Sequence, residues 1–168
     1  MHTVGDRTTA GSATGGAAAK RLSAGGTSVT FDRVGDRWHH VVFAAGGFRA
    51  ESVEGPDAAG HDPRWPASPV LAEVTLMDTP AGSALVGVGR AGRSHFSASI
   101  TPHPTRPDTL VFDVACRLQE PPGSLGSTYR VGDGRATIRI PASDAGDSLP
   151  RTVRWRYTVG PGGLHPEV

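Results

Sequence analysis

Hydrophobic and polar residues alternate with a period of two along most of the chain between residues 27 and 159. The clearest example is the segment Thr109–Leu118, where one face carries Leu110, Phe112, Val114, Cys116 and Leu118. Successive side chains of a β-strand point to opposite faces of the sheet, so this period indicates strands with one buried face. No segment keeps a helical period for three turns.

Glycine- and proline-rich segments separate these alternating stretches and predict turns. Gly35-Asp36 lies between two of them, and glycine at the first central position favours a type II′ hairpin turn. The predicted strands are Ser28–Val34, Arg37–Ala44, Phe48–Val53, Val70–Met77, Ser83–Gly89, Ser94–Thr101, Thr109–Leu118, Tyr129–Val131, Arg135–Ile140 and Thr152–Val159. The pattern predicts an all-β fold, an antiparallel β-sandwich or flattened barrel of about nine to ten short strands.

The strand pattern also predicts the domain organisation. A length of 168 residues suits one domain, which we expect to span residues 27–159. Residues 1–26 consist mainly of Gly, Ala, Ser and Thr, and residues 160–168 are similarly poor in apolar side chains. Because such segments bury little surface, both are expected to be flexible tails.

Composition narrows the function classes. The net charge is +1, which gives no overall field to attract nucleic acid or an anionic membrane. The single cysteine excludes an internal disulfide, and no apolar run is long enough for a signal peptide core or a membrane span. We therefore expect a soluble cytoplasmic protein. Sixteen of the 17 basic residues are arginine, a bias typical of a GC-rich bacterial genome.

Residues 84–101 contain Gly87-x-Gly89-x-x-Gly92, the glycine spacing of a dinucleotide-binding loop. That loop requires a helix after the glycines, because the helix N-terminus faces the pyrophosphate. Ser94–Thr101 instead alternates as a strand, and Pro102, Pro104 and Pro107 follow it. The segment is therefore interpreted as a β-hairpin, and no cofactor is predicted.

A trial register places a polar cluster on the outer face of this hairpin. Aligning Val86 and Val88 with Ala98 and Phe96, and Phe96 with Val114, brings five residues together: His95, Ser97, Asp113, Gly87 and Gly89. Glycines within a strand permit close approach of a ligand or of another backbone. An ordinary solvent-facing sheet surface would carry polar residues like those of this cluster.

This cluster leads to a main prediction and an alternative. The main prediction is a non-enzymatic binding or interaction module whose ligand or protein partner contacts the His95 cluster, with the identity of that partner unknown. The alternative is a hydrolase-like enzyme in which Asp113 orients His95 as a general base for Ser97 or Ser94. No oxyanion hole can be derived for it from the sequence.

A second alternative is an anion or nucleic-acid binder. Arg139, Arg154 and Arg156 would form a basic stripe if the last two predicted strands paired. Nucleic-acid-binding sheets place stacking aromatic residues on the basic face, whereas Trp155 and Tyr157 alternate to the opposite face. Nucleic acid is therefore the less favoured partner.

Three further residue types receive structural interpretations. Cys116 lies on an apolar strand face, which favours a core position over a nucleophile. His39 and His40 are strand neighbours that point to opposite faces, so together they cannot chelate a metal, and no metal site is predicted. Trp65, in the Pro-rich segment 55–69, is expected either to close an open end of the sandwich, which is favoured, or to be an exposed anchor for a partner.

Overall fold

The computed structural model describes residues 17–55, 65–144 and 146–167, and every regular element in these ranges is a β-strand. Six strands form the first antiparallel sheet, in the order β1-β2-β3-β4-β9-β10. Their bounds are β1 Lys20–Ala24, β2 Thr27–Val34, β3 Arg37–Ala44, β4 Phe48–Ser52, β9 Gly126–Val131 and β10 Ala136–Pro141.

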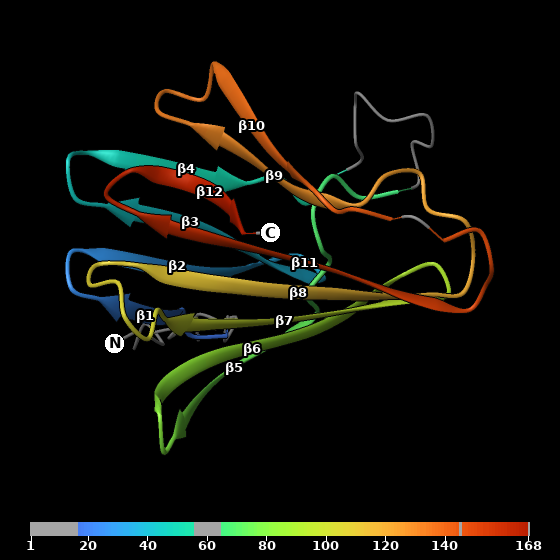
Figure 1. The fold of residues 1–168 in the computed structure, drawn as a ribbon, viewed down its shortest axis with the longest axis horizontal. Coiled ribbons are helices and arrows are strands. Elements are labelled where there is room, and N and C mark those ends of the chain that lie inside the picture. The colour runs from blue at the N-terminus through green and yellow to red at the C-terminus, as the bar shows by residue number, and fades with distance from the viewer. Residues whose placement is uncertain (1–16, 56–64, 145, 168) are drawn as a thin grey trace, which may run out of the picture.

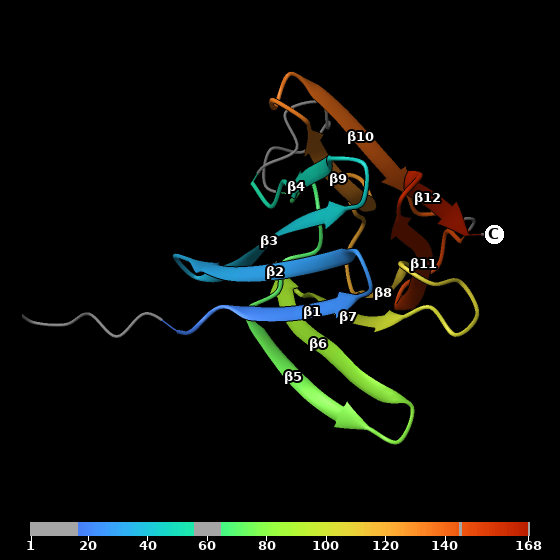
Figure 2. The same cartoon turned by 90° about the vertical axis from the view of Figure 1, so that its left-hand side faces the viewer.

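The second antiparallel sheet also has six strands, in the order β12-β11-β8-β7-β6-β5. Their bounds are β5 Glu73–Thr79, β6 Gly82–Ala91, β7 Ser94–Pro102, β8 Leu110–Leu118, β11 Arg151–Gly160 and β12 Gly163–Glu167. The two sheets pack against each other as a sandwich (Figures 1 and 2). This confirms the predicted fold class, with twelve strands in place of about ten.

The two additional strands lie in the segments expected to be tails, so that expectation was wrong for residues 20–24 and 163–167. β1 pairs with β2 and buries Leu22, and β12 pairs with β11 and buries Leu164. Each is an edge strand with only one deeply buried large side chain, which leaves a weak sequence signal. Backbone pairing with a long neighbouring strand holds these two segments in the sheets, although they have few apolar side chains to bury. The tail predicted for residues 1–16 lies outside the described residues.

The core forms where the apolar faces of the two sheets meet. The first sheet contributes Val29, Phe31 and Val42, all with an exposed fraction of 0%. From the second sheet, the Phe112 ring stacks on Tyr157 with centroids 4.9 Å apart and faces His40 at 5.7 Å. Alternation along each strand therefore determines which residues enter the core.

The first hairpin forms as predicted. Residues 35 and 36 join β2 to β3, and Gly35 has a φ of +63°. Asp36 does not have a positive φ. Among the described residues other than glycine, Asp108 is the one that does. Positive φ at the first central position alone is the signature of a type II′ turn.

Trp65 is buried, as predicted for a residue that closes the sandwich. Its exposed fraction is 5%, and its ring centroid lies 6.1 Å from that of Phe96. Its indole Nε1 is buried without a hydrogen-bond partner among the described residues. The ring therefore contributes apolar packing rather than a polar contact.

Candidate functional site

Residues 84–101 form the β6–β7 hairpin, as the alternation predicted. Gly92 and Arg93 make its two-residue turn, and Gly92 has a φ of +55°. Ser94 directly continues into β7, so no helix N-terminus is available to face a pyrophosphate. The third glycine of the apparent fingerprint thus serves the turn.

The trial register for β6 was wrong by one residue. Ala98 lies opposite Gly87, and Phe96 lies opposite Gly89, rather than opposite the valines. Gly87 and Gly89 therefore face the sandwich interior, and Val88 lies on the outer face with an exposed fraction of 47%. The prediction had placed Val86 and Val88 inward. The displacement by one residue reverses the face of every side chain along β6.

The inward glycines make room for another part of the backbone. The segment 70–72 crosses between the sheets, where the Trp38 amide donates to the Leu71 carbonyl and the Ala72 amide donates to the Val88 carbonyl. A Cβ atom on Gly89 would lie 2.1 Å from the Val70 carbonyl oxygen, and one on Gly87 would lie 2.8 Å from Leu71 Cδ1. Gly89 thus admits the backbone of the crossing segment, and Gly87 admits its Leu71 side chain.

The predicted register of β7 with β8 was displaced by two residues. Ser99, not Ser97, lies opposite Asp113, and His95 lies opposite Arg117. Asp113 is four positions from Arg117, about 13 Å along the strand, and its carboxylate accepts hydrogen bonds from Arg154. The hydrolase-like cluster of His95, Ser97 and Asp113 therefore does not assemble.

A different set of side chains surrounds His95. Arg90 on β6 and Arg117 on β8 are its direct cross-strand neighbours on the outer face. Directly opposite residues in an antiparallel pair have Cβ atoms about 5 Å apart. Arg90, His95 and Arg117, called the basic row below, therefore place three basic side chains across three adjacent strands.

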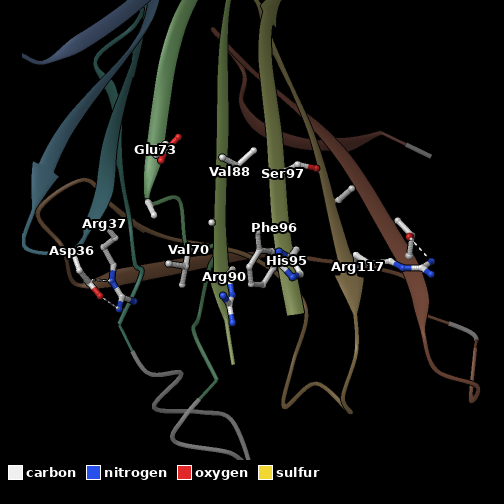
Figure 3. A pocket seen from close by; sticks show the side chains of 14 residues that line it. Asp36, Arg37, Val70, Glu73, Val88, Arg90, His95, Phe96, Ser97 and Arg117 are labelled. Carbon is white, nitrogen blue, oxygen red and sulfur yellow. Dashed lines mark hydrogen bonds and ion pairs between the residues drawn. The ribbon is translucent and has the colours of Figure 1, made fainter. Parts of the chain in front are cut away.

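The basic row lines a groove of about 590 Å³ that reaches from the β2–β3 turn to β11 (Figure 3). The Arg90 side chain lies beside the His95 ring, whereas Arg117 extends towards β11, where its Nη1 donates to Thr152 Oγ1 at 3.3 Å. Ser97 and Gly89 also line this groove, and Asp113 and Gly87 do not. Three of the five predicted site residues, His95, Ser97 and Gly89, thus border one surface hollow.

Two outer-face arginines of this sheet are neutralised by carboxylates, but the two of the basic row are not. Arg154 pairs with Asp113 at 3.1 Å, and Arg156 pairs with Glu167 at 2.9 Å. Within the described chain, neither Arg90 nor Arg117 has a carboxylate partner within 4.0 Å. Their positive charge is therefore available to a ligand.

The predicted stripe of Arg139, Arg154 and Arg156 does not form. Arg139 lies on β10, at the edge of the first sheet, whereas Arg154 and Arg156 lie on β11 of the second. The Arg139 guanidinium donates to Thr128 Oγ1 and to the Leu125 carbonyl. The stripe required β10 and β11 to pair, and the two strands belong to different layers of the sandwich.

A buried polar network, which the sequence interpretation missed, connects the two sheets. His40 Nε2 lies 2.9 Å from the Tyr129 hydroxyl, which lies 2.6 Å from the Tyr157 hydroxyl. Burial lowers the pKa of His40 to about 3 and raises that of Tyr157 to about 12. At neutral pH the imidazole is therefore neutral, and both phenols keep their protons.

Glu54 lies at the entrance to this network. Its carboxylate is 3.8 Å from His39 Nδ1 and 3.9 Å from His40 Nδ1, and it accepts a hydrogen bond from Ser52. Burial raises its pKa, which the Ser52 hydrogen bond partly opposes. The adjacent histidines of the sequence therefore approach one carboxylate, although only His40 is deeply buried.

Cys116 occupies the predicted core position. It has an exposed fraction of 0%, and burial raises the pKa of its thiol to about 12. We expect a thiol reagent to modify the folded protein roughly 100-fold or more slowly than the urea-unfolded chain, since both access and the thiolate are lacking. Timed labelling followed by mass spectrometry measures this, and equal rates in the two states would place the thiol at the surface.

Comparisons with protein-family models, with curated proteins and with solved structures find no match for this chain. Within the described ranges, no group of three or more His, Cys, Asp or Glu side chains is placed to hold a metal ion. The described part of the chain also lacks a helix long and apolar enough to cross a membrane. The groove and its charges are therefore the features of the described chain that point to a function.

Proposed function

We propose that this domain is a non-enzymatic binding module whose ligand presents a negatively charged group to the basic row. One observation carries the proposal: Arg90 and Arg117 flank His95 on adjacent strands without carboxylate partners, while Arg154 and Arg156 on the same sheet face are paired. Two guanidinium groups without carboxylate partners on one sheet face would attract an anion, which each can bind through charge-assisted hydrogen bonds.

The groove has the size of a ligand site. Small-molecule sites have volumes of about 300–1,000 Å³ and combine an apolar lining with a few polar groups. The volume of about 590 Å³ lies within this range. Arginine suits the anion because its planar guanidinium binds carboxylate or phosphate groups through two hydrogen bonds.

The double variant Arg90→Ala/Arg117→Ala tests the proposal with pyrophosphate as the probe. At tenfold excess over its Kd, an anion that binds only the folded state adds about 1.4 kcal/mol. We therefore expect pyrophosphate to raise the Tm of the unmodified protein by roughly 3–5 °C. The double variant should lose this shift, as measured by thermal unfolding at low salt.

The matched control is Arg154→Ala/Arg156→Ala, which removes the same charge from the same sheet face. Its pyrophosphate shift should stay within about 1 °C of that of the unmodified protein. Multivalent anions also stabilise proteins through exclusion from their surface, an effect that all variants share. Equal shifts in the two double variants would show that the basic row is not the anion site.

A further inference from the structure

The strand register also determines the residues beside the basic row. One step further into the sheet, Val88 lies opposite Ser97, and Ser97 lies opposite Ala115. These three residues, called the floor row below, all line the groove. Val88 is 47% exposed, which is unusual for a valine in the middle of a sheet face otherwise rich in polar residues.

The floor row explains the hollow. Ser97 and Ala115 have short side chains, whereas the neighbouring basic row carries long ones, which leaves a hollow over the floor row. The half-buried Ala72 adds further apolar lining. The groove therefore has a basic margin and a largely apolar floor.

Acidic residues lie at the end of the groove away from Arg117. Glu73 is the cross-strand neighbour of Val88, whereas Asp36 at the same end is paired with Arg37 at 2.8 Å. A second negative group on the ligand would meet the Glu73 carboxylate. The site therefore favours a ligand with one anionic end and an uncharged remainder.

We propose that the ligand is a small amphipathic anion, with a carboxylate-like head on the basic row and an apolar body over the floor row. This inference rests on the proposed function and adds the chemical class of the ligand. Single-stranded nucleic acid fits less well, because the aromatic residues Phe96, Trp155 and Tyr157 are buried and offer no stacking surface.

The straight-chain carboxylates acetate, butanoate, hexanoate and octanoate test the ligand class on the full chain. Full burial of a methylene group tightens binding by about fourfold, and half-burial in an open groove by about twofold. We therefore expect octanoate to bind roughly 16-fold more tightly than butanoate. NMR titrations of the backbone amides measure the affinities and should show the largest shifts at Val88, Ser97 and Ala115.

Octan-1-ol tests how much the charged head contributes to binding, and variants of the floor row test how much the apolar body contributes. Octan-1-ol should bind at least about tenfold more weakly than octanoate, because it lacks the charge that Arg90 and Arg117 attract. Ser97→Phe fills the floor and should reduce octanoate binding to the level of acetate, while pyrophosphate binding persists. Val88→Asn is a second floor-row variant, and it replaces an exposed side chain. Thr101→Phe is the control, because Thr101 lies on the same face of β7 but outside the groove.

Each outcome supports or contradicts a specific statement. If octanoate binds no more tightly than acetate while the pyrophosphate shift still requires Arg90 and Arg117, the amphipathic ligand is wrong and the anion module stands. If octan-1-ol binds as tightly as octanoate and the arginine variant changes nothing, both proposals fail. If Ser97→Phe, Val88→Asn and Thr101→Phe all leave octanoate affinity unchanged, the apolar body does not lie on the floor row.

Discussion

His40→Gln is expected to flatten the pH dependence of stability between about pH 6.5 and pH 3. The folded-state pKa of His40 is about 3, because burial disfavours the charged imidazole, whereas an unfolded histidine titrates near 6.5. Between these values the unfolded chain binds the extra proton, so the free energy of unfolding decreases as the pH falls. The slope is at most about 1.4 kcal/mol per pH unit, and the total is on the order of 4–5 kcal/mol.

Urea unfolding at a series of pH values measures this effect as the difference between the unmodified protein and His40→Gln. Glutamine can keep a hydrogen bond to Tyr129 but does not titrate, although it loses the ring stacking with Phe31. His95→Gln, the same substitution at an exposed histidine, is the comparison variant. Parallel curves for His40→Gln and the unmodified protein would contradict a buried neutral imidazole.

Glu54 has the opposite effect on the pH dependence of stability. Its folded-state pKa is raised by burial, so its contribution to stability is present below the ordinary glutamate pKa of about 4.5 and is lost as the pH rises through the raised value. The two neighbouring groups therefore partly compensate each other in mildly acidic solution. For this reason the His40→Gln difference, rather than the total pH profile, is the informative quantity.

Gly89→Ala is expected to destabilise the fold by about 3 kcal/mol or more, the upper range for overpacking a core. The added Cβ would lie 2.1 Å from the Val70 carbonyl oxygen and 2.8 Å from the Ala72 amide nitrogen. Both are backbone atoms, and the Ala72 amide also donates to the Val88 carbonyl. The crossing segment would have to move away from β6.

Two other glycines give a graded control for this prediction. Gly87→Ala should cost about 1 kcal/mol, because its Cβ meets the flexible end of the Leu71 side chain. The Cβ atom of Gly55→Ala would meet no atom of the described residues within 4 Å, and this variant should change stability by less than about 0.5 kcal/mol. Denaturant unfolding measures all three, and equal costs at Gly89 and Gly55 would show that the close backbone approach is unimportant.

The Arg90–His95 pair of the basic row could have been predicted from the sequence. Gly92-Arg93 is a two-residue turn, and its length alone places Arg90 opposite His95. The sequence interpretation instead aligned strands by matching apolar residues, which placed Val86 and Val88 inward. Turn length is the stronger constraint, because a hairpin register cannot change without changing the loop.

The residues that reach the site from more distant segments could not be predicted from turn length. Arg117 reaches His95 through the β7–β8 pairing, and residues 103–109 between these strands do not determine the register by their length. Val70–Ala72 approaches Gly87 and Gly89 from a separate segment that also bonds to Trp38. Local alternation contains no information about such contacts.

The sequence by itself determined the all-β class, the approximate positions of the strands between residues 27 and 159, and the burial of Cys116, because side-chain period and hydrophobicity are local properties. The tertiary structure decided the faces of β6, the edge strands β1 and β12, and the assembly of Arg90, His95 and Arg117. It also brought His40 of one sheet against Tyr157 of the other through Tyr129. These features depend on pairing and packing between segments far apart in the chain, where the free energy of the whole core selects one register among several that local pattern permits.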